Sequence, residues 1–565
     1  MIKNAAGLLV LGAALAACGG GSDGPGAATP VASNPSTGTP SGSGGTTTPT
    51  TPTPPPPPPP PPPEVKVLSG AIARYAAQNS GVDFAVQIKP NNFTPTGTLV
   101  VNASDPSNVI GTQVGVTTNT DGSYTLALSS KANAAAGHYA GNVTLKLCAD
   151  QDCATAQAVP SVTVPYDLTV LASTTAWPGD HLTALAAWTD APEWSTFQGN
   201  AAHTAYVPVT INPDQMQLRW KSAAINSNTS YSYNGYDNSA TLTVANGVFY
   251  GAGSNMLKAR KEYDGSVVWS YDFSGLSSPT VYPPAVASGT VYMAAGQSPI
   301  YLFAFDAATG AVRFKAPLAY PWNATQAPTP VDDAIYANSG YNALYAFKPT
   351  GELLFNKSLT YSSSSTGSPA VDANSVYVYD GALHILDRKT GTITSEIRNG
   401  TAPTYYGYGQ SGAPVLGANG SVFVADYGSA QLNSSVTNNQ LLKFNTVKSY
   451  IDWRVAGNYP LTPAYANGVV YAPNYSPYRV EARAEADGAL LWSWTPNQAG
   501  ETLWNAEPII TKNLLFVSTN LATYAIDIGT HKAVWSYPAA GRLALSRSGI
   551  LYIQNVEAVV AVNLK

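Results

Sequence analysis

A repeated pattern occupies the C-terminal two thirds of the chain, and it limits the possible folds more than any other feature of the sequence. Each unit has an apolar strand-like stretch, an Asp or an equivalent residue, a turn that is often Thr-Gly, and then an aromatic residue four positions after the turn. Seven units follow one another, with spacings of 45, 41, 40, 58, 39 and 43 residues between equivalent positions. A period of about 40–45 residues with several strands per unit is typical of the blades of a β-propeller.

The residues that open and close the units also recur. A proline followed by an apolar pair opens most units, and proline is tolerated at the first residue of a strand, where no N–H is needed for the ladder. These prolines are Pro284, Pro330, Pro369, Pro414, Pro463 and Pro508. The closing aromatic residues are Trp269, Phe314, Phe355, Trp453, Trp492 and Trp535, and Ser395 stands in this place in the fourth unit. We interpret the aromatic residues as packing wedges between neighbouring blades.

The two ends of the repeat region predict one further blade. Residues 550–553 and 559–562 form apolar strands near the C-terminus, but no outer strand follows them. The missing strand is present upstream as residues 217–221, which contain Trp220. Pairing of these segments would close the ring and remove open sheet edges. The sequence therefore predicts an eight-bladed β-propeller over residues 195–565, with seven blades as the alternative count.

A separate β domain is predicted before the repeat. Residues 64–172 contain six or seven short strands with alternating apolar residues, separated by turn clusters, which is the size and pattern of an immunoglobulin-like sandwich. Residues 173–194 form a tryptophan-bearing connector. Cys148 and Cys153 lie in this domain, and their spacing predicts a disulfide at the tip of a hairpin, with a metal site on the cysteine pair as the alternative.

The N-terminal residues are typical of an exported protein. Residues 1–17 have a charged start and an apolar stretch too short to span a bilayer, which predicts a signal peptide. The sequence Leu-Ala-Ala-Cys ending at Cys18 resembles the bacterial lipobox, which implies lipidation of Cys18 and, with Gly19 after it, the outer membrane. The alternative is an ordinary signal peptide with an accidental cysteine. Residues 18–63 are rich in Gly, Ser, Thr and Pro, and we expect a solvated tether.

The charge of the chain argues against one class of partner. Charged residues make up 11% of the sequence and the net charge is −5. A nucleic-acid-binding protein needs a basic patch or stripe, and no such concentration of Lys and Arg is present. We therefore expect no nucleic-acid partner.

The repeat resembles that of the pyrroloquinoline-quinone (PQQ) propellers. The likeness lies in the Asp-x-x-Thr-Gly-x-x-x-Trp pattern and in residues 194–204, which are similar to the segment before the first blade of such proteins. The family contains quinone-dependent dehydrogenases and non-catalytic lipoproteins similar to the outer-membrane assembly factor BamB. The resemblance covers about residues 195–565 and implies a propeller fold, while the immunoglobulin-like domain and long tether depart from lipoproteins of this kind.

The sequence motifs typical of the quinone enzymes are not found in the repeat region. The resemblance would imply an adjacent cysteine pair, a Ca²⁺ site of Glu, Asn and Asp, and a catalytic Asp, but residues 195–565 contain no cysteine and no motif places such a calcium site. There is also no Cys-x-x-Cys-His haem motif. We therefore predict no catalytic residue, no metal and no cofactor. PQQ with Ca²⁺ belongs only to the alternative of a dehydrogenase.

The loops expected at one face of the ring are rich in tyrosine. In a propeller, the connection between blades shares a face with the loop between the second and third strands. The residues predicted to form a ligand- or partner-binding face are Tyr231, Tyr233, Tyr236, Asp237, Trp322, Tyr361, Tyr405, Tyr406, Tyr408, Tyr427, Tyr475 and Trp504. Tyr and Trp among Asn, Ser and Gly are typical of adaptable recognition surfaces. The alternative is that Tyr is simply a preferred surface β residue in this chain.

Three functions remain open from the sequence. The first is a non-enzymatic scaffold on the outer membrane that binds a protein partner of the envelope through this face, in the assembly of outer-membrane proteins. The second is a PQQ-dependent dehydrogenase. The third is a lipoprotein that binds a glycan or another surface ligand, which the aromatic loops, the tether and the added sandwich domain favour.

Overall fold

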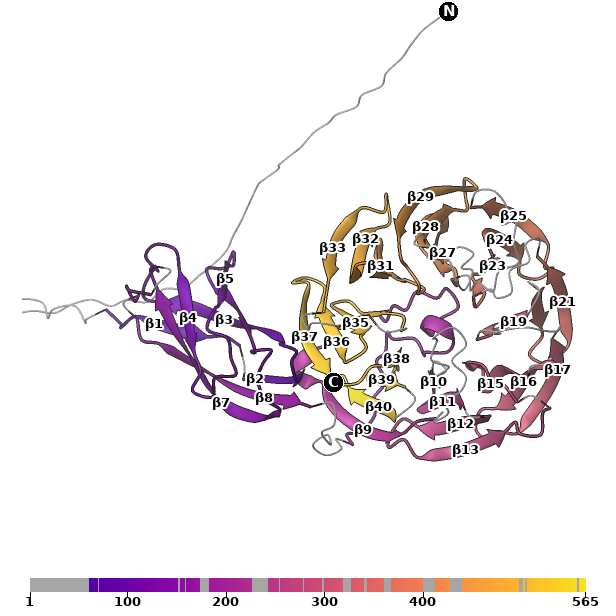
Figure 1. Ribbon diagram of the computed structural model, residues 1–565, viewed down its shortest axis with the longest axis horizontal. Coiled ribbons are helices and arrows are strands. Elements are labelled where there is room, and N and C mark those ends of the chain that lie inside the picture. Colours follow the sequence, from indigo (N-terminus) through magenta and orange to yellow (C-terminus); the bar gives the residue numbers. More distant parts are fainter. Residues whose placement is uncertain are drawn as a thin grey trace, which may run out of the picture. The chain divides into compact units, whose positions relative to one another are not determined.

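The computed structural model describes most of the chain from residue 60 onward, and it consists of β-strands (Figure 1). The described residues are 60–565 without 70, 151–152, 158, 173–181, 226–241, 254, 278, 297–298, 319–326, 340–342, 360–366, 400–411, 427–438, 497–500, 504–505 and 556–557. Helical structure in this part is limited to the 3₁₀ turns η1 (Phe197–Gly199), η2 (Pro213–Gln215) and η4 (Ala418–Gly420). The predicted all-β class is confirmed. Among the described residues no helix has the length and apolar character needed to cross a membrane.

The N-terminal domain is a sandwich of two four-stranded sheets. One sheet has the order β1 (Glu64–Val67), β3 (Asp83–Asn91), β6 (Tyr124–Ser129), β5 (Gly115–Thr118), and the other β2 (Ile72–Ala77), β8 (Val162–Leu171), β7 (Gly137–Cys148), β4 (Val100–Ser104). All pairs are antiparallel except β2 with β8. Val86 of the first sheet and Leu145 of the second are fully buried in one shared core, as alternating apolar positions require.

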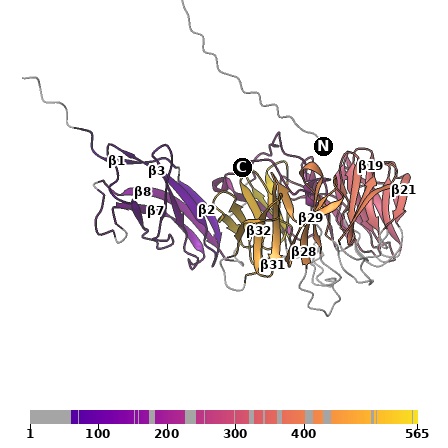
Figure 2. The ribbon, with the colours of Figure 1, turned by 90° about the horizontal axis from the view of Figure 1, so that it is seen from above.

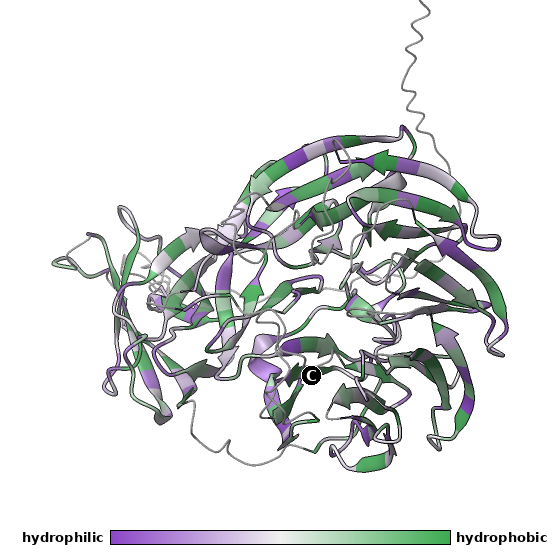
Figure 3. Cartoon of the chain, turned by 45° about the vertical axis from the view of Figure 1, so that its right-hand side comes forward, coloured by the Kyte–Doolittle hydropathy of each residue, from purple (hydrophilic) through white to green (hydrophobic). Residues whose placement is uncertain are grey.

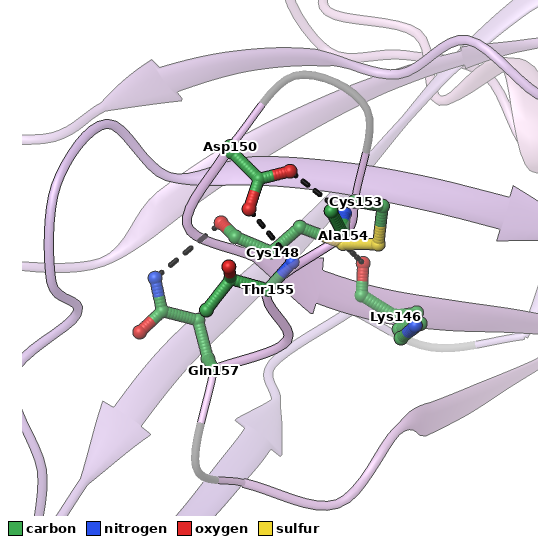
Figure 4. Close-up of a disulfide and its surroundings, with 7 residues drawn as sticks. All are labelled: Lys146, Cys148, Asp150, Cys153, Ala154, Thr155 and Gln157. Atoms are coloured by element: carbon green, nitrogen blue, oxygen red, sulfur yellow. Dashed lines mark hydrogen bonds between the residues drawn. A yellow bond between two sulfur atoms is a disulfide. The ribbon is translucent and has the colours of Figure 1, made fainter.

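Cys148 and Cys153 form a disulfide at the end of β7 (Figure 4). The carboxylate of Asp150 accepts hydrogen bonds of 2.7 Å from the backbone N–H groups of Ala154 and Thr155, which closes the loop that the disulfide spans. The side chain of Gln157 donates to the carbonyl oxygen of Cys148. The disulfide therefore closes a local turn, as the spacing of the two cysteines predicted.

The second part of the chain forms eight four-stranded antiparallel sheets, which we number 1 to 8 in chain order. Sheets 1 to 4 contain β10 (Thr243–Ala245), β11 (Val248–Gly253), β12 (Met256–Lys261), β13 (Val267–Asp272); β14 (Ala285–Ala287), β15 (Thr290–Ala295), β16 (Ile300–Asp306), β17 (Val312–Leu318); β18 (Thr329–Val331), β19 (Ala334–Ser339), β20 (Ala343–Phe347), β21 (Leu353–Ser358); and β22 (Ala370–Val371), β23 (Ser375–Tyr379), β24 (Ala382–Asp387), β25 (Ile393–Arg398).

Sheets 5 to 8 repeat this order with small changes. They contain β26 (Val415–Leu416), β27 (Ser421–Asp426), β28 (Asn439–Asn445), β29 (Tyr450–Gly457); β30 (Ala464–Ala466), β31 (Val469–Tyr475), β32 (Tyr478–Ala484), β33 (Leu490–Trp494); β34 (Ile509–Ile510), β35 (Leu514–Ser518), β36 (Thr523–Asp527), β37 (Lys532–Tyr537); and β38 (Arg542–Leu545), β39 (Ile550–Gln554), β40 (Ala558–Asn563) with β9 (Gln217–Ala223). The first strands of successive sheets are neighbours except between sheets 4 and 5, where the outer strands β25 and β29 are neighbours. Since β10 lies beside both β14 and β38, the sheets form a propeller ring (Figure 1).

The strand β9 closes the ring. It pairs antiparallel with β40, with Trp220 opposite Ala561, so the predicted pairing of the upstream segment with the C-terminal strands is present. The buried Trp220 stacks on Phe249 of sheet 1 and donates from Nε1 to the carbonyl oxygen of Glu262 at 2.9 Å. The eighth sheet thus takes its outer strand from the N-terminal end of the repeat region.

The outer-strand aromatic residues pack against the turn of the following sheet. Trp269 of sheet 1 donates from Nε1 to the carbonyl oxygen of Ala307 at 2.9 Å, and a Cβ added to Gly310 would lie 2.6 Å from its ring. Gly351 would meet Phe314 of the preceding sheet in the same way. The repeat residues are therefore wedges between sheets, as the sequence indicated. The outer strands that carry them alternate exposed and buried residues and appear as mixed purple and green arrows in Figure 3.

A short stretch before the ring crosses its centre. We call residues 194–207 the central segment. Its backbone carbonyl groups accept hydrogen bonds from the first strands of six sheets. In addition, the hydroxyl group of Thr196 donates to the carbonyl oxygen of Pro328, which precedes the first strand of sheet 3. The carbonyl groups belong to Trp194, Ser195, Ala201, Ala202, Thr204 and Ala205, and their donors are Val244, Val286, Val371, Leu416, Tyr465 and Ile510. The segment therefore connects seven sheets at the axis of the ring (Figure 1).

Candidate functional site

The antiparallel order of each sheet gives the ring two different faces. The connections from one sheet to the next and the links between second and third strands lie at one end of the strands, which we call the loop face. The turns between first and second and between third and fourth strands lie at the other end, the turn face. Figure 2 shows the ring from the side, with strands such as β19, β28 and β31 running between the two faces. Of the tyrosine-rich segments predicted to bind a partner, the structure describes residues 474–479, which lie at the loop face.

The structure places one of the twelve residues predicted for that face. Tyr475 is the last residue of β31, at the loop face of sheet 6, and is half-buried. The other eleven lie outside the described residues and stay predictions: Tyr231, Tyr233, Tyr236, Asp237, Trp322, Tyr361, Tyr405, Tyr406, Tyr408, Tyr427 and Trp504. Cys18 also lies outside the described part of the chain.

Tyr475 belongs to a tight hairpin at the loop face, which we call the sheet-6 hairpin (residues 474–479). Tyr475 and Tyr478 are paired across it, and their ring centroids are 5.3 Å apart. Tyr478 is 40% exposed, and Ser476 and Pro477 at the tip are also exposed. The hairpin therefore presents two tyrosine rings and a proline to the solvent.

Hydrogen bonds within the sheet-6 hairpin and to Asn458 fix the hairpin in place. The side-chain oxygen of Asn474 accepts the N–H groups of Ser476, at 3.0 Å, and of Asn458, at 3.2 Å. The N–H of Tyr475 donates to the carbonyl oxygen of Asn458 at 2.8 Å. Since Asn458 directly follows the outer strand of sheet 5, these bonds fix the hairpin to the connection between two sheets.

A buried carboxylate anchors the same region. Glu481 of β32 has no exposed surface, and its oxygens accept hydrogen bonds from Tyr459 (2.7 Å), Asn474 (3.1 Å), Arg479 (2.6 Å) and Arg483 (2.6 Å). A buried charge is tolerated only when it is paired and its lone pairs are satisfied. Burial acts to raise the pKa of Glu481, but the hydrogen bonds from Tyr459, Arg483 and Asn474 outweigh it, and the pKa is lowered. Glu481 is therefore ionised at neutral pH.

The hydroxyl group of Tyr459 stays protonated beside this carboxylate. Burial and the hydrogen bond to Glu481 raise the pKa of Tyr459 far above its ordinary value. Tyr459 is fully buried and therefore acts as a permanent donor. Together these residues form a rigid polar base beneath the half-buried Tyr475 and the exposed Tyr478 of the hairpin.

Other polar groups beneath the loop face pair with one another. His384 of sheet 4 is fully buried, with Nε2 at 2.9 Å from an oxygen of Asp380 and Nδ1 at 3.6 Å from an oxygen of Glu396. In sheet 7, the hydroxyl group of Tyr524 donates to Glu501 at 3.1 Å. Among the described residues, no group of three or more His, Cys, Asp or Glu side chains is arranged to hold a metal ion.

The sequence analysis did not single out Arg479, Glu481 or Arg483. Their alternation places all three side chains on one face of β32, and this is the signal that could have identified them. The corresponding third strands of sheets 2 and 3 carry apolar and aromatic residues over the same stretch. A run of charged residues in a strand that is buried in other sheets indicates a local polar network.

Comparison with known protein families supports the fold at the level of the repeat. A family model described as "Outer membrane protein assembly factor BamB" matches residues 179–394, 301–432 and 380–562, which together span more than half of the chain. The chain is also similar to the tetrathionate hydrolase of Acidithiobacillus ferrooxidans, with 22% identity over 491 residues that cover 72% of this chain and 93% of the hydrolase.

Two solved structures are also similar to this chain. The crystal structure of BamB from Moraxella catarrhalis has a TM-score of 0.48 and 16% identity, and the match covers 62% of this chain and 99% of that one. A europium-containing methanol dehydrogenase has a TM-score of 0.48 and 13% identity, with 64% of this chain and 89% of that one covered.

Proposed function

The chain belongs to the family described as outer membrane protein assembly factor BamB, and we propose that it is a non-enzymatic scaffold that binds a protein partner of the bacterial envelope through its loop face. The observation that carries this proposal is the sheet-6 hairpin. Its exposed Tyr478 and Pro477 stand on a hydrogen-bonded base, although closure of the ring does not require them. Aromatic residues with Arg are enriched at the centres of protein interfaces.

The rigidity of the hairpin supports a role in binding. An interface that must first order its side chains loses part of its binding free energy to conformational entropy. Here Asn474 and Glu481 hold the hairpin in one arrangement before a partner arrives. The other predicted tyrosines of the loop face would extend this surface around the ring.

The remaining predictions complete the proposal. We propose that residues 1–17 are a signal peptide, that Cys18 carries the lipid anchor to the outer membrane, and that residues 18–63 are the tether. We further propose that residues 64–172 are an immunoglobulin-like domain, that residues 173–194 are a connector, and that residues 195–565 form one closed eight-bladed propeller. In this arrangement the tether would allow the ring to engage a partner at a distance from the membrane.

The test is photo-crosslinking in cells. A photo-reactive amino acid replaces Tyr478 at the loop face, and the matched control carries it at Val447, which is 77% exposed at the turn face. We expect a discrete crosslinked protein of the envelope with the probe at position 478 and none with the probe at 447. Equal crosslinking from both positions, or crosslinks to glycan or lipopolysaccharide alone, would contradict the scaffold proposal.

A second candidate function is the hydrolysis of tetrathionate. It is favoured by the alignment that covers 93% of the tetrathionate hydrolase of Acidithiobacillus ferrooxidans. The test is incubation of the purified full chain with tetrathionate, with the loss of tetrathionate measured over time. Turnover that scales with the protein concentration and disappears on heat denaturation would replace the scaffold proposal by an enzymatic function.

A further inference from the structure

Arg479 uses only one edge of its guanidinium group within the protein. It is the second residue of β32, and its Nε and Nη2 atoms both lie 2.6 Å from the same oxygen of Glu481. A guanidinium group has five N–H donors in a planar fork. The two N–H groups on Nη1 and one on Nη2 therefore remain, at the end of the side chain that points away from Glu481. Arg479 makes no other hydrogen bond with a described residue, and its side chain is 30% exposed.

The charge around Glu481 is not balanced. Arg313 and Arg388 each have a carboxylate of their own, Asp306 at 2.8 Å and Asp333 at 2.6 Å. In sheet 6, two arginines share the single carboxylate of Glu481. The cluster therefore carries one net positive charge.

The geometry directs this positive charge to the loop face. Arg483 is only 11% exposed, and its Nη1 donates to the carbonyl oxygen of Gly488 at the turn on the opposite side. Arg479 lies next to the exposed Tyr478, at the loop end of the strand. The free donors of the cluster consequently stand at the loop end of β32, in a chain whose net charge is −5, and the ring of the preceding Tyr478 lies on the opposite face of the strand.

The arrangement suits a planar acceptor with two oxygens. A carboxylate binds the end of a guanidinium group through two parallel hydrogen bonds, and lysine cannot reproduce this geometry. Because Glu481 already holds Arg479 in place, the binding of such a group would require little ordering of the side chain. Tyr475 and Tyr478 lie on the opposite face of the same hairpin, where they offer apolar surface to a neighbouring part of the partner segment.

We propose that Arg479 binds a carboxylate of an acidic segment in the protein partner, and that Tyr478, on the other face of the hairpin, packs against apolar residues of the same segment. This inference rests on the proposed scaffold function and adds the chemistry that the partner presents. It assigns the recognition of the partner to the sheet-6 hairpin.

The experiment uses an array of twelve-residue peptides that combine Asp and Glu with apolar residues. Each peptide has a counterpart in which every Asp is Asn and every Glu is Gln. The array is incubated with the purified full chain carrying Cys18→Ala, so that no lipid is attached, and with the same chain carrying Arg479→Lys or Arg313→Lys. Arg313 is the matched control, since it is 44% exposed, is paired with its own carboxylate, and lies near the turn face. The Kd of the best peptide is then measured by fluorescence anisotropy.

We expect the acidic peptides to bind and their amide counterparts to bind at background level. Arg479→Lys keeps the charge but loses the two-pronged donor edge, so Kd should rise roughly tenfold, as for the loss of one charge-assisted hydrogen bond. Arg313→Lys should leave Kd unchanged. Equal binding of acidic and amide peptides, absence of binding to any peptide, or equal Kd values for the parent chain and Arg479→Lys would each overturn the inference.

A further arm separates a protein carboxylate from a lipid phosphate. The same three proteins are floated with vesicles of phosphatidylethanolamine and phosphatidylglycerol. We expect no flotation that depends on Arg479, and such flotation would overturn the assignment to a protein segment. If the probe at position 478 crosslinks an envelope protein but the array shows no preference for acidic peptides, this inference fails and the scaffold proposal stands. If the probe at position 478 gives no crosslinked protein, both fail.

Discussion

His203, in the central segment, is a single residue that links the stability of the ring to pH. Its side chain is fully buried, and its Nδ1 lies 3.0 Å from the carbonyl oxygen of Pro414, which directly precedes the first strand of sheet 5. Burial lowers the pKa of His203 from its usual 6.5 to about 4, against the smaller opposing effect of the bond to Pro414. The folded protein therefore holds the neutral imidazole, with Nδ1 as the donor to that carbonyl group.

The sign of the pH dependence follows from this shift. Between pH 6.5 and about 4 the unfolded chain binds a proton at His203 that the folded protein excludes, so stability falls as the pH falls through this range. The shift in the pKa of His203 lowers the free energy of unfolding by about 3 kcal/mol once the pH has fallen to about 4. We expect His203→Gln to reduce the difference in unfolding midpoint between pH 7.5 and pH 4.5, measured by differential scanning calorimetry. An unchanged difference would show that His203 does not govern the acid sensitivity.

At the scale of the element, the turn between the third and fourth strands, which is Thr-Gly in sheets 2 to 4, packs a sheet against the one before it. Gly351 has a φ of +90°, in the left-handed region, and a Cβ added to it would lie 2.6 Å from the ring of Phe314. Glycine is therefore required there for its backbone and for the space that the neighbouring wedge occupies. In sheet 4 the aromatic residue is replaced by Ser395, and the facing turn position of sheet 5 is Ser449, whose hydroxyl oxygen lies 3.5 Å from that of Ser395.

We expect Gly351→Ala to destabilise the protein by about 2–4 kcal/mol, from the left-handed backbone and from overpacking against Phe314. The matched control is Gly289→Ala, because Gly289 has a φ of +70° but no atom within 4 Å of an added Cβ. That variant should lose only about 1–2 kcal/mol. Urea unfolding of the two variants measures the difference. Equal losses would mean that the contact with Phe314 contributes nothing.

The sequence predicted this level of structure well because most units follow one local rule. The turn glycine and the aromatic residue four positions later recur in most units, although Ser449 and His531 stand in place of the glycine and Ser395 in place of the aromatic residue, and this pattern indicated the sheets and the pairing of β9 with the C-terminal strands. The polar base of sheet 6 could not be predicted in the same way. Tyr459, Asn474 and Glu481 occupy three different positions of the repeat, and this combination occurs in one unit. The repeat pattern therefore does not reveal the polar base.

At the scale of the whole molecule, Trp220 secures the junction where the two ends of the ring meet. It is 2% exposed, and its neighbours Phe249 and Tyr552 belong to sheets 1 and 8. Since β9 and β40 are distant in the chain, no short loop holds this junction together. Packing and the ladder of hydrogen bonds must maintain it.

We expect Trp220→Ala to cost about 3–5 kcal/mol, as for other buried tryptophans, and to open the ring locally. Hydrogen exchange measured by mass spectrometry should show faster exchange in residues 217–223 and 558–563. The control is Trp269→Ala, in which the same kind of wedge is removed between sheets that the chain joins directly. A lower melting temperature for Trp220→Ala with unchanged exchange in both segments would contradict the special role of this junction.

The central segment also has a consequence for how such rings change in evolution. Its carbonyl groups meet the first strands in chain order, from Trp194 with sheet 1 to Ala205 with sheet 7. A gene duplication that added one unit, or a deletion that removed one, would leave a first strand without its partner or a carbonyl group without its donor. Residues 194–207 therefore match sheets 1 to 7 in order, and a change in the number of these units would call for a matching change in the length of this segment.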